Sequence, residues 1–437
     1  MKISVIGCGY LGAVHAACMA KLGHDVVGID VDKSKVDALS QGLAPFFEPG
    51  LPGLLTESMA TGRLAFTTDI AAVRDAEVHF VCVGTPQRKG EYAADLTYVD
   101  EAFASLLPYV RDGAVLVGKS TVPVGTAERL AEILEAEVPS ATLVWNPEFL
   151  REGFAVEDTL HPDRLVYGVA AGDGGKRAVA VLDAIYATPL NEGSPRIITD
   201  FATAQLVKVA ANSFLATKIS FINAMAELCE ATGADVTDLA DAIGHDARIG
   251  RRFLNAGLGF GGGCLPKDIR AFMARAGELG ADQTLSFLRE VDAINMRRRV
   301  RMVDLAREEC HGSIVGLKVA VLGAAFKPNS DDIRDSPALS VAEQMRLQGA
   351  VVTVTDPQAL PNARRSFPEL RYADTALEAA QDANIVLLLT EWSEFTDLDP
   401  QTLAARVADK RILDGRNALD VGTWRAAGWT YRALGRP

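Results

Sequence analysis

Lys2-Ile3-Ser4-Val5-Ile6-Gly7-Cys8-Gly9-Tyr10-Leu11-Gly12 is the stretch that decides the fold. A short apolar run, typical of a buried strand, ends in the pattern GxGxxG, and a helical pattern and a second strand at 25–29 follow. In such a βαβ unit the first glycine makes the turn, the second admits a pyrophosphate, and the third lets the helix pack on the strand. The pattern therefore predicts a dinucleotide site at Gly7, Gly9 and Gly12.

The acidic residue after the second strand indicates which dinucleotide binds. Asp30 stands roughly 20 positions beyond the glycine pattern, where a carboxylate binds the 2′-hydroxyl of the adenosine ribose. No arginine stands beside it to pair with a 2′-phosphate, so we expect NAD and not NADP. Lys35 either touches the same ribose or is a solvated helix lysine, and the sequence leaves both interpretations open.

Length and composition limit the classes of protein to be considered. The 437 residues exceed the roughly 250–300 of a single core and predict two or three domains. A net charge of −13 argues against nucleic acids and anionic membranes as partners. The six cysteines lack the spacing of metal ligands, so we expect no metal site and a reducing compartment. With no signal-like segment and no apolar run of about 20 residues, a cytoplasmic location is expected.

Two further strands, at 78–83 and 114–118, are predicted to end in turns rich in small and hydroxyl residues. Ligands of open α/β sheets bind beyond the carboxyl ends of strands, so Thr85, Ser120 and Thr121 are candidates for the nicotinamide half of the site. Alternatively, each hydroxyl caps a helix.

A strand at 142–145 leads into the segment 146–153, which carries two carboxylates. Glu148 and Glu152 are four residues apart, so a helical turn here would place both on one face.

A long helix is predicted from Thr199 through Ala231, where apolar residues recur at intervals of three and four. Lys208 and Asn212 share one face of it, and either they point together into a cleft or Lys208 extends its ammonium into solvent. Further helices are expected from Ile269 to about Glu309, with Arg297–Arg301 as a solvated basic face.

The stretch 257–268, Gly-Leu-Gly-Phe-Gly-Gly-Gly-Cys-Leu-Pro-Lys-Asp, presents a lone cysteine at the end of a glycine run. Cys264 is a candidate nucleophile, because Lys267 and Asp268 supply charge beside the sulfur and glycines allow a close approach to a ligand. The alternative is a flexible linker with an incidental buried cysteine.

Strand and helix patterns alternate again after residue 312, with strands expected at 318–323, 351–355, 385–390 and 411–414. The first of these strands lacks the second and third glycines of the pattern, so a phosphate-bearing ligand is compatible with it but a second dinucleotide is not expected. The predicted fold is α/β, with two doubly wound Rossmann-like domains joined by a long central helix and a helical middle domain. The expected domains are 1–198, 199–310 and 311–437.

Many ordered motifs make the chain similar, over essentially its whole length, to the UDP-glucose/GDP-mannose dehydrogenase family. The motifs that carry the resemblance are 7–12, 47–51 (Phe-Glu-Pro-Gly-Leu), 84–86, 119–126 (Lys-Ser-Thr-Val-Pro-Val-Gly-Thr), 146–153, 162–164, Lys208 with Asn212, 257–268, 326–328 and 331–334. The chain departs from the pattern at Gly263, where the family often has serine, and at 89–94, where an Asp-Gly turn is common.

The resemblance implies an enzyme that oxidises the C6 alcohol of a sugar nucleotide to a carboxylate with two NAD. The family's intermediates are a thiohemiacetal and a thioester on the cysteine that matches Cys264. Lys208 and Asn212 would stabilise the oxyanion, while Thr121, Glu148 and Asp268 would handle water and protons, in an order that the sequence does not assign.

The resemblance also names binding residues. The cofactor set is Gly7, Gly9, Tyr10, Leu11, Gly12, Asp30, Lys35, Thr85, Pro86, Ser120, Thr121, Glu152, Lys267 and Arg334. The substrate set is Phe149, Leu150, Glu152, Lys208, Asn212, Arg248, Phe253, Gly257, Phe326 and Lys327. Arg248 is expected to reach the uridine diphosphate of a neighbouring subunit, which implies a homodimer or a larger homo-oligomer.

Two alternatives stay open beside oxidation of UDP-glucose. One is the same chemistry on another sugar nucleotide such as GDP-mannose, although residues 247–250, Ala-Arg-Ile-Gly, resemble the branch that uses UDP-glucose. The other is an NAD-binding regulator without enzymatic activity, which the retained cysteine, lysine and asparagine disfavour.

Overall fold

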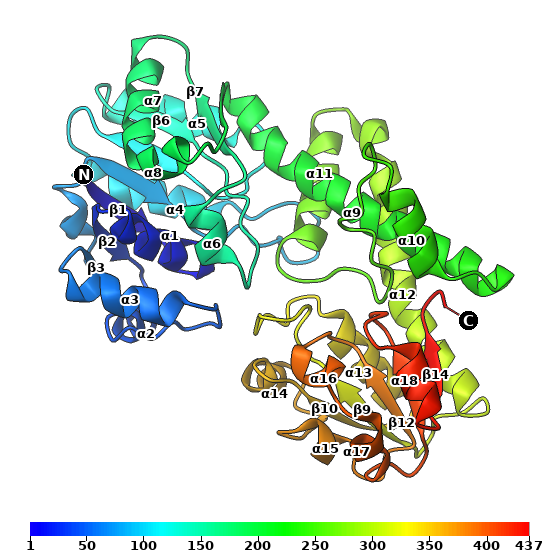
Figure 1. Cartoon of the computed structure of the whole chain (residues 1–437). Helices are drawn as coiled ribbons and strands as arrows, with labels where there is room; N and C mark the ends of the chain where they lie inside the picture. The colour runs from blue at the N-terminus through cyan, green and yellow to red at the C-terminus, as the bar shows by residue number, and fades with distance from the viewer. Residues whose placement is uncertain (437) are drawn as a thin grey trace. The chain divides into compact units, whose positions relative to one another are not determined.

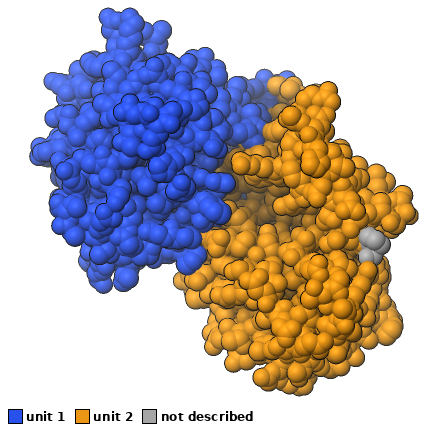
Figure 2. Space-filling model, in the orientation of Figure 1, with its two compact units in different colours: residues 1–211, 270–280 blue, residues 212–269, 281–437 orange. Residues whose placement is uncertain are grey.

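The computed structural model describes residues 1–436, which form two compact units. Unit 1 contains residues 1–211 and 270–280, and unit 2 contains residues 212–269 and 281–436 (Figure 2). Two of the three boundaries fall inside helices, α9 (Phe201–Thr232) and α11 (Leu265–Glu278), and the third follows Gly280, just beyond the end of α11.

Unit 1 is built on an eight-stranded sheet with the order β3-β2-β1-β4-β5-β6-β7-β8 (Figure 1). The pairs from β3 to β6 are parallel, whereas β6 and β7 are antiparallel. The strands are β1 (Lys2–Ile6), β2 (Asp25–Ile29), β3 (Leu64–Thr67), β4 (Val78–Val81), β5 (Val115–Gly118), β6 (Thr142–Trp145), β7 (Leu165–Val169) and β8 (Arg196–Thr199). The order from β3 to β5 is that of a doubly wound dinucleotide-binding sheet.

Two hydrophobic clusters flank this sheet, as a doubly wound fold requires. Helix α1 is buried from Gly12 to Ala20, because its side chains are apolar or small on nearly every face. The helices of the first part of unit 1 are α1 (Tyr10–Lys21), α2 (Lys33–Leu39), α3 (Leu51–Ala60), α4 (Thr97–Leu106), α5 (Thr126–Glu137), α6 (Ala155–Leu160), α7 (Asp173–Ile185) and α8 (Ala187–Asn191), with short 3-10 turns η1 (Ile70–Val73) and η2 (Leu107–Tyr109).

Unit 2 contains a second, fully parallel sheet of six strands with the order β11-β10-β9-β12-β13-β14 (Figure 1). Its strands are β9 (Lys318–Leu322), β10 (Val351–Thr355), β11 (Arg371–Tyr372), β12 (Ile385–Leu388), β13 (Arg411–Asp414) and β14 (Thr430–Ala433). Its further helices are α10 (Val236–Gly244), η3 (Asp282–Leu285), α12 (Phe287–Glu309), α13 (Pro337–Leu347), α14 (Leu360–Ser366), α15 (Ala376–Ala379), α16 (Ser393–Thr396), α17 (Pro400–Ala404) and α18 (Val421–Ala426). The predicted α/β fold with two doubly wound domains, a long helix and a helical middle region is confirmed.

The prediction that Arg297–Arg301 forms a solvated basic face holds for exposed Arg297 but is wrong for Arg298 and Arg299. Arg298 is fully buried, and it donates to the carbonyl of Gly257 at 3.3 Å and pairs with Glu230 at 3.3 Å. Arg299 is also buried and pairs with Asp335 at 2.7 Å. These arginines face inward because each neutralises a carboxylate and satisfies backbone carbonyls of the glycine run.

No helix within residues 1–436 is long and apolar enough to cross a membrane.

Candidate active site

The glycine pattern after β1 has the geometry of a pyrophosphate-binding turn. Gly7 adopts φ +86°, and its N–H donates to the carbonyl of Ile29 at 2.8 Å. A Cβ at Gly12 would lie 1.8 Å from the carbonyl oxygen of Gly7, so only glycine fits there. A Cβ at Gly9 would meet nothing within 4 Å, which leaves the open space that a pyrophosphate needs beside the backbone.

Asp30 follows β2 and is held by this same turn. Its carboxylate accepts the N–H of Cys8 at 2.8 Å and pairs with the ammonium of Lys35 at 2.9 Å. Lys35 is therefore placed against Asp30 and is not a freely solvated lysine. The pair leaves the carboxylate ordered at the carboxyl end of β2, where an adenosine ribose is bound in folds of this type.

Hydroxyl side chains connect the turn that follows β4 to the turn that follows the neighbouring strand β5. Thr85 Oγ1 donates to the carbonyl of Thr121 at 2.8 Å, and Ser120 Oγ donates to the carbonyl of Val83 at 2.6 Å. Neither Thr85 nor Ser120 caps a helix, because α4 is capped at Leu96 and α5 at Gly125. The capping alternative is thus wrong for both residues.

The segment 146–153 is an irregular loop, so the idea that a helical turn aligns Glu148 and Glu152 is wrong. The helix α6 begins only at Ala155. Pro147 disfavours helical backbone at Asn146, and Asn146 is engaged by buried partners: its amide donates to the carbonyl of Val166 at 2.9 Å and its Oδ1 accepts from Lys119 at 3.0 Å.

Glu148 projects from this loop toward α9. Its carboxylate accepts the N–H of Leu150 at 2.8 Å and pairs with Lys208 at 2.9 Å. The Lys208 ammonium lies 5.7 Å from the centre of the Phe149 ring, and the guanidinium of Arg164 covers that ring at 3.8 Å. Unit 1 thus brings the predicted residues Glu148, Phe149 and Lys208 into one cluster, in which Lys208 is buried and the other two are partly buried.

Unit 2 brings together a second group of predicted residues around Asp268. One oxygen of this buried carboxylate accepts from Asn212 at 2.6 Å, and the other pairs with Lys267 at 2.6 Å. The N–H of Asp268 donates to the carbonyl of Cys264 at 2.9 Å, in the first turn of α11. Cys264 therefore directly precedes a helix whose N-terminal dipole favours an anion such as a thiolate.

Cys264 is exposed, whereas the other five cysteines are buried. The glycine run before it is packed: residues 256–262 are buried, and a Cβ at Gly259 (φ +85°) would lie 2.1 Å from Asn295 Oδ1. Asn295 accepts the N–H of Phe260 at 2.7 Å and donates to its carbonyl at 2.9 Å. The glycines serve close packing, so the alternative of a flexible linker with a buried cysteine is wrong.

Several residues that hold this loop were missed from the sequence. Asn223 Oδ1 accepts the N–H of Gly257 at 2.9 Å, and Arg416 donates to the carbonyls of Phe326 at 2.9 Å and Gly259 at 3.3 Å. They lie in ordinary helix and strand-end positions with no local motif, so no pattern could have singled them out.

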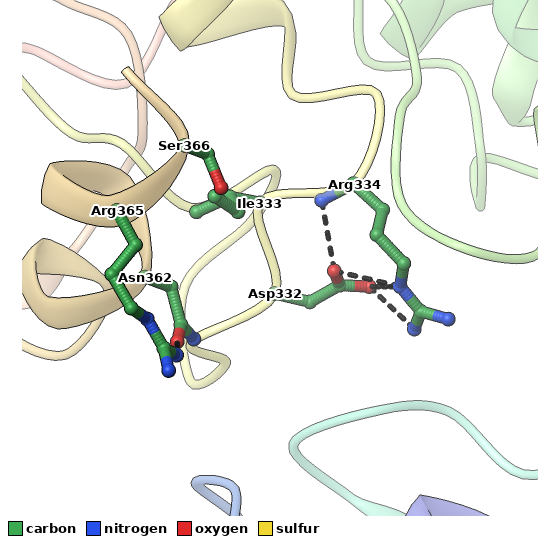
Figure 3. Close-up of a pocket in the computed structure, with 6 residues that line it drawn as sticks. All are labelled: Asp332, Ile333, Arg334, Asn362, Arg365 and Ser366. Atoms are coloured by element: carbon green, nitrogen blue, oxygen red, sulfur yellow. Dashed lines mark hydrogen bonds and ion pairs between the residues drawn. The ribbon is translucent and has the colours of Figure 1, made fainter. Parts of the chain in front are cut away.

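Arg334 lies over Gly263, the position at which the chain departs from the family pattern. A Cβ at Gly263 would be 2.2 Å from Arg334 Cζ, and the guanidinium pairs with Asp332 at 2.8 Å. Arg334 lines a cavity of about 300 Å³ whose other lining residues are Asp332, Ile333, Asn362, Arg365 and Ser366 (Figure 3). A larger residue at 263 requires this flexible arginine to move.

Three predicted binding residues lie elsewhere in unit 2. Arg248 is exposed and pairs with Asp246 at 2.6 Å. Phe253 is partly exposed and adopts φ +66°, which is rare for a bulky side chain. Lys327 lies 5.4 Å from the ring centre of Phe326. Within residues 1–436 no cluster of three His, Cys, Asp or Glu side chains has the arrangement of a metal site.

Comparisons with known proteins agree along the whole chain. The UDP-glucose/GDP-mannose dehydrogenase family is matched by its NAD binding domain at residues 1–189, its central domain at 202–297 and its UDP binding domain at 320–421. NAD is therefore the cofactor, as Asp30 and the turn at Gly7–Gly12 predicted.

Individual relatives match at full length. The chain is 43% identical to a UDP-glucose 6-dehydrogenase of Rhizobium meliloti (strain 1021) over 100% of both chains, and 40% identical to UDP-glucose 6-dehydrogenase TuaD of Bacillus subtilis (strain 168) over 100% of this chain and 93% of the relative. The solved UDP-glucose dehydrogenase of Pyrobaculum islandicum superposes with a TM-score of 0.90 at 37% identity, covering 100% of this chain and 98% of that one. The chain belongs to the UDP-glucose/GDP-mannose dehydrogenase family.

Proposed function

We propose that this chain oxidises UDP-glucose to UDP-glucuronate, with two NAD consumed for each sugar nucleotide and Cys264 as the nucleophile. The observation that carries the proposal is the exposure of Cys264 at the start of α11, beside the buried carboxylate of Asp268 and its partners Asn212 and Lys267. The activity named for full-length relatives at 40% and 43% identity supports the choice of substrate. NAD supplies the acceptor for the hydride in each oxidation.

The chain's own groups account for the remaining chemistry. The C6 alcohol loses a hydride and a proton to become an aldehyde, and the Cys264 sulfur bonds to the aldehyde carbon to form a thiohemiacetal. Loss of a second hydride and a proton leaves a thioester. Water then breaks the carbon–sulfur bond, so that the carboxylate leaves and the thiol is restored.

Asp268 is suited to orient the groups around the sulfur. Asn212 uses one N–H of its amide on Asp268 and has a second N–H for an oxyanion. Lys208, one helical turn earlier on α9, supplies a positive charge to the same kind of intermediate, and Glu148 is held ready to handle protons and water by its ion pair with Lys208. Thr121 completes the proposed set.

The experiment that tests this function measures how many NADH are formed for each UDP-glucose consumed. Purified protein is given a limiting amount of UDP-glucose with excess NAD, and NADH is measured by its absorbance while the sugar product is identified by mass. We expect two NADH per UDP-glucose, UDP-glucuronate as product, and no free aldehyde captured by an added carbonyl reagent. One NADH per sugar, with an aldehyde or keto-sugar accumulating, would assign an ordinary two-electron dehydrogenase.

The same assay addresses the alternatives. Oxidation of GDP-mannose with a higher kcat/KM than UDP-glucose would assign the substrate to the other branch of the family. Binding of NAD without NADH formation from any sugar nucleotide would favour a regulator.

We also propose that the protein is a homodimer formed along α9. Phe214, Phe221 and Leu228 recur every seven residues and are 67%, 48% and 57% exposed, so one apolar stripe of the helix is uncovered. A seven-residue repeat is the spacing by which two helices pack against each other. We expect the wild-type protein to sediment as a dimer and the Phe221→Glu variant to sediment as a monomer. Leu347→Glu, at another exposed apolar residue, is the control and should remain a dimer.

A further inference from the structure

One buried carboxylate joins three segments that are far apart in the sequence. Glu48, in the loop before α3, is 2% exposed. Its carboxylate accepts the N–H groups of Gly153 and Ala155, each at 2.7 Å, and the phenol O–H of Tyr10. Tyr10 belongs to the dinucleotide turn, whereas Gly153 closes the loop 146–153.

Tyr10 contacts the same loop directly. Its oxygen accepts the N–H of Gly153 at 2.9 Å, while its ring packs on Phe46 with centroids 4.8 Å apart. Burial, the hydrogen bond to Glu48 and the charges of Glu48 and Glu152 raise the pKa of Tyr10 well above its usual value. The phenol therefore stays protonated and continues to donate to Glu48 across the neutral and moderately alkaline range.

The loop 146–153 is thus held at both ends by buried charged groups. At its start, Lys119 donates to the carbonyl of Asn146 at 3.4 Å and to its side-chain oxygen at 3.0 Å. At its end, Glu48 and Tyr10 fix Gly153. Between these two anchors lies Glu148, whose pairing with Lys208 depends on where the backbone of the loop is placed.

We propose that Glu48 and Tyr10 are positioning residues that tie the dinucleotide turn to the loop carrying Glu148 and Glu152. A dinucleotide that orders the turn then also orders the loop, so NAD binding improves the placement of groups that act on the sugar nucleotide. The proposal rests on the function proposed above. It assigns a role to Glu48 and gives Tyr10 a role besides contact with the cofactor.

A merely structural role is a weaker explanation of this arrangement. Taking a carboxylate out of water is unfavourable, and packed apolar side chains of similar volume are often as stable. The carboxylate instead supplies acceptors for two backbone N–H groups and one phenol at the same time. Such a junction is directional, so it specifies where Gly153 sits relative to Tyr10.

Hydrogen exchange tests the junction without reference to turnover. In the wild type, saturating NAD is expected to slow exchange of the Gly153 and Ala155 amides. In Tyr10→Phe and Glu48→Gln these amides exchange faster without NAD, and NAD no longer slows them. Tyr109→Phe is the matched control, because it removes a phenol from another tyrosine of unit 1, whose ring lies under Arg74, and it should behave like the wild type.

Steady-state kinetics with UDP-glucose test the consequence. Each single variant should lower kcat about tenfold, and the double variant should be no worse than the more affected single one, because both residues act as one unit. NAD affinity, measured by fluorescence titration, should change by less than about threefold, and the unfolding midpoint should stay within about 4 °C of the wild type.

Three outcomes would overturn the proposal: multiplicative losses in the double variant, a loss confined to NAD affinity, or unchanged exchange at Gly153 and Ala155. If the wild type fails to oxidise UDP-glucose but the exchange results are as expected, the proposed function is wrong while the junction itself stands.

Discussion

The ammonium of Lys208 lies 2.9 Å from the carboxylate of Glu148, and only 6% and 12% of the two side chains are exposed. This ion pair joins α9 to the loop after β6. Because water is largely excluded, each charge depends on the other, and removing one leaves the partner buried without its counter-charge.

We predict strong coupling between these two residues. Lys208→Met and Glu148→Gln should each lower the free energy of unfolding by about 3–5 kcal/mol, and the double variant should lose less than the sum. Denaturant titration of the four proteins measures the coupling. Lys33→Met, which removes an exposed i,i+4 pair with Asp37, is the control and should cost no more than about 0.5 kcal/mol. Additive losses for Lys208 and Glu148 would contradict the prediction.

Cys264→Ser should retain binding of NAD and UDP-glucose but lose overall oxidation, because a hydroxyl at neutral pH is a far poorer nucleophile than a thiolate. The measurement is NADH formation alongside binding titrations, with Cys229→Ala, a buried cysteine of unit 2, as the control. If the Cys264→Ser variant kept more than about a tenth of the wild-type turnover, its activation barrier would have risen by less than roughly 1.4 kcal/mol. That result would contradict the assignment of Cys264 as the nucleophile.

NAD should be preferred over NADP because a 2′-phosphate would approach the Asp30 carboxylate. Asp30→Ala should lower the ratio of kcat/KM for NAD to kcat/KM for NADP. Without Asp30, Lys35 has lost its ion-pair partner and can attract the 2′-phosphate of NADP. Lys21→Ala, on the end of α1, should leave the ratio unchanged. Equal kcat/KM values for both cofactors in the wild type would show that Asp30 does not select the cofactor.

Lys119 should make stability rise with pH in the alkaline range. Burial lowers the pKa of Lys119 from its usual 10.5 to about 8. Below about pH 8 both folded and unfolded chains hold the proton, so this lysine adds no slope. Between about pH 8 and 10.5 the unfolded chain binds a proton that the folded chain has released, so the free energy of unfolding increases with pH.

The comparison that isolates this effect is wild type against Lys119→Met, with the free energy of unfolding measured at pH 7.5, 9 and 10. Across this range the free energy of unfolding of the wild type should rise by up to about 3 kcal/mol relative to that of the variant, since each unit of pKa shift corresponds to about 1.4 kcal/mol. A constant difference would mean that the lysine is not desolvated. Exposed Lys33→Met should show no such gain.

The sequence alone determined those features that depend on local pattern. The apolar run ending in Gly7–Gly12 specified a βαβ unit, because the strand and helix periods and the turn glycines are all encoded within one short stretch. The long apolar periodicity predicted α9 to within two residues at its start and one at its end. Asp30 indicated NAD because a single carboxylate at a known position of that unit selects the cofactor.

Only the tertiary structure decided which charged groups meet. Arg298 and Arg299 read as a solvated basic run but are buried, because a one-dimensional pattern does not say which face of α12 other segments cover. The loop 146–153 is not helical, since buried partners at Asn146 and Gly153 outweigh the local spacing of its glutamates. Glu48 meets Gly153 across 105 positions of sequence. Contacts of this kind form when packed elements exclude water and bring partners from distant segments to each buried charge, and the spacing of residues along the chain does not carry that information.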